Sequence, residues 1–248
     1  MTHVVALSGG KDSTALALRM AEVWPALDVT YYCSPTGDEL PEMQAHWCHL
    51  EELLGQPIVK VTGTTLSELI VMFKMLPNGR ARWCTRMLKI QPCLAYLHGL
   101  TDPVLYVGLR ADEPMRAGIY SEDVTSRYPL REWGWGVGDV RRYLARRGVA
   151  IPVRTDCARC YAQRLGEWYS LWRDYPDIWA SAVEQERWVS EQRGKEHTLR
   201  SPSRDTWPAS LALLEVEFRG GRIPRGWSSQ QSLWTGMTSP GACRVCTL

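Results

Sequence analysis

The stretch HVVALSGGKDSTALALRM, residues 3–20, decides the fold of the first half of the chain. Residues 3–7 read as a short buried strand. Residues 14–23 carry apolar side chains at helical spacing, and Pro25 follows as a stop signal. A strand that ends in a glycine-rich turn and opens a helix aims several backbone N–H groups at one point, where the helix dipole adds positive charge. The sequence therefore predicts an anion-binding loop at SGGKDS.

The side chains of this loop suit a phosphate ligand. Its glycines permit close backbone approach, its serines can donate hydroxyl hydrogen bonds, and its lysine supplies a full positive charge. A carboxylate beside a phosphate suggests that Mg²⁺ lies between them. The predicted nucleotide-binding residues of the loop are Ser8, Gly9, Gly10, Lys11, Asp12 and Ser13.

Strand-like and helical segments alternate after this loop. Further strands are expected at residues 29–33, 57–61 and 104–107, and helices at residues 39–54, 66–76 and 85–98. Such alternation is typical of a parallel sheet with helices on both faces. We therefore expect an α/β fold with a doubly wound, mostly parallel sheet.

The character of the chain changes after about residue 131. Nine of the twelve tryptophans follow that point, and helices are expected at residues 138–147, 161–173, 177–192 and 207–218. Trp168 and Trp172 lie four residues apart on one helix face, which favours core packing over base stacking. We predict two parts: residues 1–130 as the nucleotide-binding domain, and residues 131–248 as a helical appendage.

Composition restricts the class of protein. The formal net charge of the 248 residues is +2, too balanced to indicate nucleic-acid binding by charge alone. We see no signal peptide and no apolar run of the roughly 20 residues that a membrane span needs. The expectation is a cytoplasmic protein with no membrane partner.

The eight cysteines include two CxxC pairs, Cys157/Cys160 and Cys243/Cys246. In a cytosolic chain such pairs are typical of metal ligands, and two pairs together suggest a Cys₄ site for zinc or for an iron–sulfur cluster. The remaining cysteines outside the segment around Cys84 are expected to be packing residues.

The loop SGGKDS resembles the PP-loop, SGGxDS, of the N-type ATP pyrophosphatase superfamily. That superfamily includes phosphoadenosine-phosphosulfate (PAPS) reductases, tRNA thiolation enzymes and DNA phosphorothioation sulfurtransferases. Three further segments are similar to the PAPS reductase-like branch and occur in its order. They are YYCSPTGDELPEM, residues 31–43; RWCTRMLKIQP, residues 82–92; and VGLRADEPMR, residues 107–116. The resemblance spans roughly residues 3–160 and implies an adenine nucleotide alpha hydrolase-like fold.

The matching segments supply further candidate ligands of the nucleotide. Asp38 follows the second strand, at the edge where open α/β sheets bind ligands, so it is expected to contact the nucleotide or its metal, unless it is simply a turn residue. Lys89, Arg110 and Arg116 are expected to hold phosphate or an anionic substrate group, with solvated surface charges as the alternative. Because Lys11 favours a triphosphate, we expect ATP rather than PAPS.

The segment RWCTRMLK, which contains Cys84, resembles the segment with the cysteine pair that binds a [4Fe-4S] cluster in adenylyl-sulfate (APS) reductases; those enzymes also supply a CxxC pair further along the chain. The resemblance thus implies Cys84, Cys157 and Cys160 as cluster ligands. Trp83 stands where that family has its first cysteine, so Cys243 or Cys246 would supply the missing ligand. The competing arrangement is a zinc ion held by the two CxxC pairs, with Cys84 free beside the nucleotide.

The function implied by the resemblance is ATP-dependent adenylation of a substrate with pyrophosphate release, followed by sulfur transfer. Its candidate catalytic residues are Lys11, Asp12 and Cys84, and its cofactors are Mg²⁺ and a [4Fe-4S] cluster or zinc. An adenine nucleotide is the expected ligand, and a nucleic acid or a sulfur-donor protein is the further partner considered. The alternatives are a sulfonucleotide reductase acting on APS or PAPS, and a non-catalytic nucleotide-binding subunit of a modification complex.

Overall fold

A five-stranded parallel sheet forms the centre of the protein, with the strand order β3-β2-β1-β4-β5. The structure, a computed structural model, describes residues 1–116, 124–201 and 205–227. The strands are β1 (Thr2–Ala6), β2 (Val29–Cys33), β3 (Ile58–Lys60), β4 (Pro103–Tyr106) and β5 (Thr125–Arg127). The predicted α/β class with a parallel sheet is confirmed.

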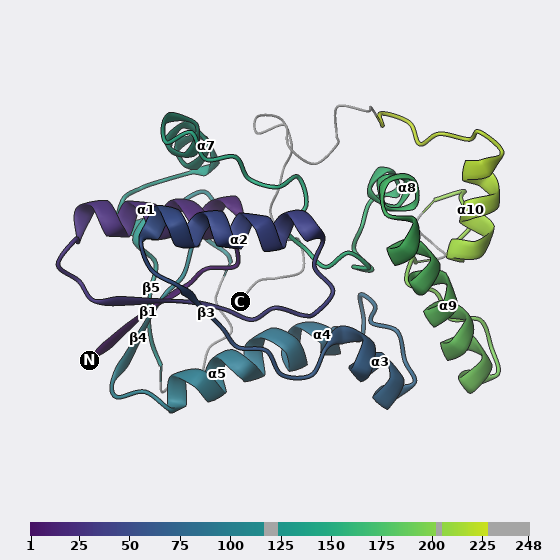
Figure 1. Cartoon of the computed structure of the whole chain (residues 1–248), viewed down its shortest axis with the longest axis horizontal. Coiled ribbons are helices and arrows are strands. Elements are labelled where there is room, and N and C mark those ends of the chain that lie inside the picture. The colour runs from purple at the N-terminus through teal and green to yellow at the C-terminus, as the bar shows by residue number, and fades with distance from the viewer. Residues whose placement is uncertain (117–123, 202–204, 228–248) are drawn as a thin grey trace.

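Both faces of the sheet are covered by helices (Figure 1). The helices α1 (Lys11–Val23), α2 (Pro41–Leu54) and α7 (Val137–Arg146) lie on one face, and α5 (Gln91–His98) lies on the other. Successive β1 residues alternate between the two cores, since Val5 packs with α1 and α2 whereas Val4 packs with α5. This two-sided burial explains why residues 4–7, from the buried part of β1 onward, are continuously apolar.

The helix on the α5 side begins further upstream, at α4 (Trp83–Thr85), and continues through a π-helical turn at Arg86–Ile90. A π-helical turn inside a helix is frequently found at a functional site. The helix α3 (Leu66–Phe73) precedes this segment and starts with a capping box between Thr65 and Glu68. These elements lie below the sheet in the view of Figure 1.

Three helices form a second core beside the sheet: α8 (Leu165–Asp174), α9 (Pro176–Arg193) and α10 (Leu211–Arg219). The expected packing role of the tryptophans is confirmed here, because Trp168 and Trp179 are buried in this core and Trp172 packs against it. The short helix α6 (Pro129–Glu132) and α7 instead contribute Leu130, Val140 and other side chains to the core around α1.

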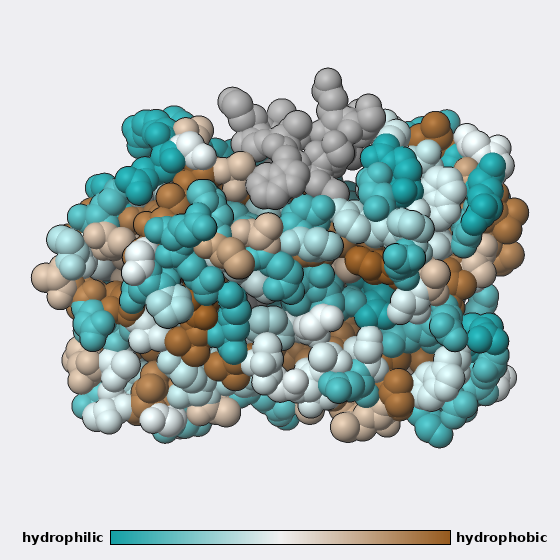
Figure 2. Space-filling model, viewed as in Figure 1, coloured by the Kyte–Doolittle hydropathy of each residue, from teal (hydrophilic) through white to brown (hydrophobic). Residues whose placement is uncertain are grey.

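The exposed side of α7 carries arginines that face solvent. Figure 2 shows hydrophilic residues covering this helix at the upper left. Among the described helices, none is long and apolar enough to cross a bilayer.

The structure adds one strand that the sequence did not predict and corrects the prediction for one cysteine. The strand β5 was not predicted, because its three residues, TSR, have no apolar pattern, and its place in the sheet comes from pairing with β4. Cys33 and Cys93 are buried as expected, but Cys48 is exposed, because it lies on the outer side of α2.

A buried carboxyl group joins the helices of the second core. Glu186 on α9 accepts hydrogen bonds from the backbone N–H groups of Leu199 (2.7 Å) and Leu211 (2.8 Å), and the latter is the first residue of α10. Burial raises the pKa of Glu186 to about 7, although the two N–H donors oppose that shift. The folded protein therefore takes up a proton at Glu186 between pH 4.5 and 7 that the unfolded chain does not.

This difference predicts a pH-dependent stability. Proton uptake favours the folded state, so the contribution of Glu186 to the free energy of unfolding should fall as the pH rises from about 5 to 7, by up to about 3 kcal/mol. The Glu186→Gln variant lacks this titration, so the stability of the wild type relative to the variant should fall over the same range. Urea unfolding at pH 5, 6, 7 and 8 measures this. The exposed Glu184→Gln is the matched control, and a pH-independent difference for Glu186→Gln would contradict the prediction.

Candidate functional site

The carboxyl ends of β1 and β4 mark the point where the strand order reverses, which is where open α/β sheets bind ligands. The loop after β1 contains Ser8, Gly9 and Gly10, and the loop after β4 contains Gly108. A Cβ atom on Gly108 would lie 2.9 Å from the backbone carbon of Asp12. A glycine is therefore needed for the β4 loop to pack against the first turn of α1.

The conformation of the SGGKDS loop depends on Gly9. Its φ of +83° lies in the left-handed region, and a Cβ atom there would lie 2.6 Å from Met43 Cε and 2.8 Å from Trp47 Nε1. Trp47 of α2 also donates a hydrogen bond to the Ser8 carbonyl at 3.3 Å. The loop is thus held closely by α2 from one side.

Gly10 faces a different neighbour. A Cβ atom at Gly10 would lie 3.6 Å from Thr155 Oγ1, a buried hydroxyl without a hydrogen-bond partner among the described residues. Nearby, the hydroxyl groups of Ser8 and Ser13 lie 3.1 Å apart, and Ser13 donates to the Gly10 carbonyl. The loop therefore offers glycine backbone and hydroxyl groups in one place, which fits the predicted phosphate ligand.

Charges of both signs meet at the start of α1. Asp12 Oδ2 accepts hydrogen bonds from Lys11 Nζ (3.0 Å) and from Arg110 Nη1 (2.7 Å), and all three residues are buried. Asp12 Oδ1 is also buried but has no partner among the described residues. Oδ1 fits a Mg²⁺ ligand, whereas Oδ2 pairs with the two cations.

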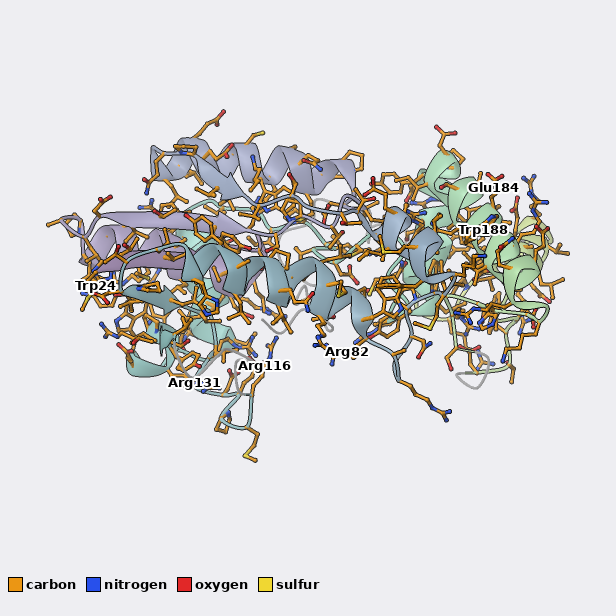
Figure 3. All side chains as sticks on the ribbon, turned by 90° about the horizontal axis from the view of Figure 1, so that it is seen from below. Trp24, Arg82, Arg116, Arg131, Glu184 and Trp188 are labelled. Carbon is orange, nitrogen blue, oxygen red and sulfur yellow. The ribbon has the colours of Figure 1, made fainter. Side chains whose placement is uncertain are left out.

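The segment after β4 is a chain of arginines and carboxylates. Arg110 also binds Asp112 (2.8 Å) and Glu113 (3.0 Å), and Arg116 binds Glu113 at 3.0 Å. The side chain of Arg131 donates to the backbone carbonyls of Arg110, Glu113 and Arg116, and Figure 3 shows Arg116 and Arg131 on the same side of the molecule. The predicted cations Arg110 and Arg116 therefore share one acidic partner.

Asp38 lies beneath the loop of the first CxxC pair. Its carboxylate accepts hydrogen bonds from the Arg159 side chain (Nε, 2.7 Å) and backbone N–H (3.1 Å), and its carbonyl accepts one from the backbone of Ala158 (2.6 Å). Burial raises the pKa of Asp38 and the Arg159 charge opposes the shift. In this structure Asp38 thus holds the cysteine loop at the carboxyl end of β2.

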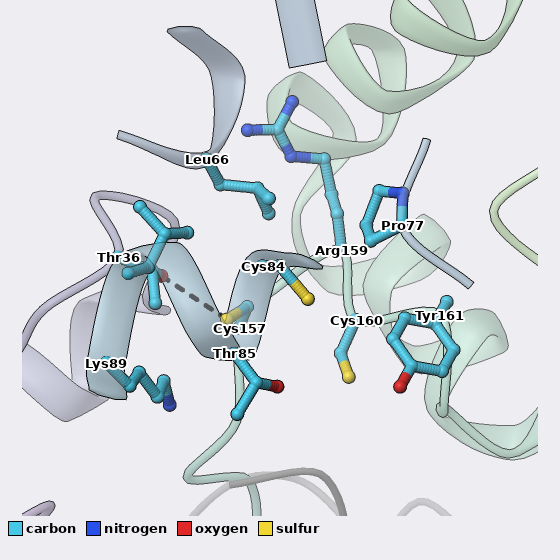
Figure 4. A pocket seen from close by; sticks show the side chains of 11 residues that line it. Thr36, Leu66, Pro77, Cys84, Thr85, Lys89, Cys157, Arg159, Cys160 and Tyr161 are labelled. Carbon is cyan, nitrogen blue, oxygen red and sulfur yellow. Dashed lines mark hydrogen bonds between the residues drawn. The ribbon is translucent and has the colours of Figure 1, made fainter. Parts of the chain in front are cut away.

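Cys84, Cys157 and Cys160 line one small pocket, which is partly open to solvent (Figure 4). Thr36 and the predicted ligand Lys89 lie in the same wall, and Thr36 Oγ1 is 3.3 Å from Cys157 Sγ. Burial raises the pKa of the Cys157 thiol to about 12 and also raises the pKa values of Cys84 and Cys160. Two segments distant in sequence, around Cys84 and around the CxxC pair, thus bring three thiols to one place.

The donor set suits a thiophilic metal, because thiols are ligands for both zinc and iron–sulfur clusters. Within the described ranges, no three Cys, His, Asp or Glu side chains are grouped closely enough to hold an ion. Cys243 and Cys246 lie outside the described residues. The structure therefore shows three candidate ligands in one pocket and leaves the completed ligand set as a prediction.

Sequence reasoning missed the arginines that shape the cysteine loop. Arg159 lies inside the CxxC pair, and Arg154 donates to the Cys157 carbonyl at 2.7 Å; both are buried. Their signal in the sequence is weak, since RTDCARC reads as an exposed basic stretch. Thr155 in the same segment lies against Gly10, so the phosphate-type loop and the thiol pocket are neighbours along one edge of the sheet.

Several known proteins are similar to this chain. An uncharacterized protein from Methanocaldococcus jannaschii is 25% identical over 214 residues, which cover 79% of this chain and 43% of that protein. The chain thus spans less than half the length of this curated relative.

Three solved structures are similar to parts of this chain, at TM-scores below 0.5. A PAPS reductase from Candida auris, in complex with phosphate, has 13% identity and a TM-score of 0.47, over 61% of this chain and 75% of that one. The U34-tRNA thiolase NcsA from Methanococcus maripaludis, with its [4Fe-4S] cluster, has 17% identity and a TM-score of 0.47, over 78% of this chain and 71% of that one. A predicted subunit of tRNA methyltransferase from M. jannaschii has 17% identity and a TM-score of 0.41, over 83% of this chain and 94% of that one.

The family model supplies the assignment. The model of the phosphoadenosine phosphosulfate reductase domain matches residues 2–153, which contain β1 to β5, the SGGKDS loop and Arg110. The match covers more than half of the chain and agrees with the resemblance seen in its motifs. The chain therefore belongs to the phosphoadenosine phosphosulfate reductase domain family.

Proposed function

We propose that this chain is an ATP-dependent enzyme that adenylates a substrate, releases pyrophosphate and supports sulfur transfer. The observation that carries the proposal is the position of residues 155–160. Thr155 lies against Gly10 of the SGGKDS loop, and Cys157 and Cys160, a few residues later, line the thiol pocket. A nucleotide bound at the loop would therefore lie next to the sulfur chemistry.

The loop would bind the triphosphate through backbone N–H groups at the start of α1 and through two cations. Lys11 and Arg110 both contact Asp12 in this structure, so an incoming phosphate would share them with that carboxylate. Asp12 would hold Mg²⁺ through Oδ1. Charged hydrogen bonds to phosphate are among the stronger interactions in proteins, which favours a triphosphate over a neutral ligand.

The reaction has two bond exchanges. An oxygen of the substrate attacks the α-phosphorus of ATP, the bond from that phosphorus to the bridging oxygen breaks, and pyrophosphate leaves. A sulfur nucleophile then attacks the substrate atom that bears the adenylated oxygen, the bond between that atom and the oxygen breaks, and AMP leaves with the oxygen. The contribution of this chain is to hold the phosphates with Lys11 and Arg110, and to place the thiol pocket beside them.

Cys84, Cys157 and Cys160 would hold a metal centre, with Cys243 or Cys246 as a further ligand. A [4Fe-4S] cluster is the first proposal and zinc the alternative; the bound centre would supply thiophilic or redox chemistry at this edge. Lys89 in the pocket wall would attract an anionic group of the substrate or sulfur donor.

A second candidate is favoured by the family match itself, namely reduction of a sulfonucleotide. The two activities release different products. Purified protein incubated with ATP, Mg²⁺ and candidate acceptors should release pyrophosphate, whereas a reductase given APS or PAPS and a thiol reductant should release sulfite. Tight nucleotide binding without either product would favour a non-catalytic nucleotide-binding subunit.

The Lys11→Ala variant tests the phosphate site. We expect ATP affinity to fall by about ten- to a hundredfold, since one charged hydrogen bond contributes about 1.5–3 kcal/mol, and pyrophosphate release to be lost. The fold should persist, because Asp12 keeps its ion pair with Arg110. Calorimetric titration with a non-hydrolysable ATP analogue measures the affinity. Lys195→Ala, an exposed lysine beyond α9, is the control, and equal affinity in Lys11→Ala and wild type would rule out this loop as the phosphate site.

The Cys84→Ala variant tests the metal centre. Anaerobically purified wild type should be brown, with broad absorption and bound iron, and Cys84→Ala should lose most of both. Cys33→Ala is the matched control, since Cys33 is a buried cysteine that does not line the pocket. Absorption spectra with iron and zinc analysis provide the measurement. A colourless protein with one tightly held zinc ion, unaffected by Cys84→Ala, would refute the cluster and favour a zinc site formed by the two CxxC pairs.

A further inference from the structure

Arg159 joins the sheet edge to the second core. Its side chain is buried and contacts side chains from three separate segments. It forms an ion pair with Asp38, donates to Ser67 Oγ of α3 at 2.8 Å, and donates to Gln185 Oε1 of α9 at 3.0 Å. Because Arg159 stands between Cys157 and Cys160, these contacts act directly on the loop that carries the two thiols.

Asp38 supports the same loop from below. It accepts hydrogen bonds from two successive backbone N–H groups, those of Ala158 and Arg159, in addition to the guanidinium. Arg154 of the same segment donates to the Cys157 carbonyl. Figure 4 shows Arg159 extending past Leu66, with its guanidinium directed away from the cysteines. The backbone between the two cysteines is therefore held from the sheet, and its arginine is held by α3 and α9.

We propose that Arg159 is a positioning residue. It sets the positions of the Cys157 and Cys160 side chains and links them to the position of α9. The inference rests on the proposed function only in taking this pocket as the sulfur site. Removal of the arginine would leave Asp38 as a buried carboxylate without its counter-charge, which is strongly destabilising for the segment around it. The loop would then open locally, while the sheet and the α1 side of the core keep their own contacts.

A lysine cannot replace this arginine fully. The guanidinium reaches Asp38, Ser67 and Gln185 at the same time through its planar fork of donors, whereas an ammonium group is a single point charge. Arg159→Lys should therefore keep the neutralisation of Asp38 and lose the connection to α3 or α9. This difference separates the positioning role from simple charge balance.

The test is thiol protection in metal-free, full-length protein. Each variant is treated with N-ethylmaleimide at neutral pH, quenched over a time course and digested, and modification of each cysteine is read by peptide mass spectrometry. In Arg159→Ala, modification of Cys157 and Cys160 should accelerate at least about tenfold. Cys93, buried under the sheet, should keep its wild-type rate and serves as the internal reference. Arg159→Lys should give an intermediate rate.

The matched control is Arg193→Ala. Arg193 also joins α9 to the end of α3, by donating to the carbonyls of Phe73 and Lys74, but it does not touch the cysteine loop. Its removal should leave the rates at Cys157 and Cys160 unchanged. Wild-type rates in Arg159→Ala, or equal acceleration in Arg193→Ala, would overturn the proposal. If the modification of Cys93 also accelerates in Arg159→Ala, that variant has lost more than the cysteine loop, and Arg159→Lys becomes the test. A wild-type rate of Cys157 modification in Arg159→Lys would then overturn the proposal.

A second readout follows the bound metal. After anaerobic reconstitution with iron and sulfide, Arg159→Lys should retain metal but show a shifted visible spectrum, because the two thiolates are displaced without being removed. An unshifted spectrum at full metal content would count against positioning. A wild type that binds no metal would refute the proposed metal centre, whereas the thiol-protection result would still test Arg159.

Discussion

The close packing of two glycines, Gly9 in the loop after β1 and Gly108 in the loop after β4, is the constraint on which the site depends. Gly9 lies against Met43 and Trp47 of α2, and Gly108 lies against the backbone of Asp12. No side chain fits at either contact without moving its neighbours. These contacts bring the β4 loop, with Arg110, to the first turn of α1, where the arginine meets Asp12. The charge network of the proposed phosphate site is therefore a consequence of backbone packing.

The second feature that organises the molecule is the ion pair between Asp38 and Arg159. It connects the carboxyl end of β2 to the loop that carries Cys157 and Cys160, and through Gln185 to the core of α8, α9 and α10. Tyr175, which precedes α9, adds a hydrogen bond to Glu42 of α2. The helix α9 thus supports the loop that carries Cys157 and Cys160, through the hydrogen bond from Arg159 to Gln185.

Local patterns predicted the elements whose stability comes from their own residues. The alternation of apolar strands with amphipathic helices indicated β1, β2 and β4. The strand β5 was missed, since three polar residues become a strand only beside β4. Cys48 was misjudged because helical periodicity alone did not show which side of α2 faces the core.

The sequence by itself determined the fold class, the family and the loop SGGKDS, because these follow from spacing and residue type along a continuous stretch. Only the tertiary structure decided which of the candidate residues lie together. It placed Asp38 beneath the cysteine loop and gave Asp12 two cationic partners. It also brought Cys84 to the same pocket as Cys157 and Cys160. The physical reason is that Asp12 meets Arg110, Asp38 meets Arg159 and Cys84 meets Cys157 across more than 70 residues of chain, and a sequence pattern carries no such distance information.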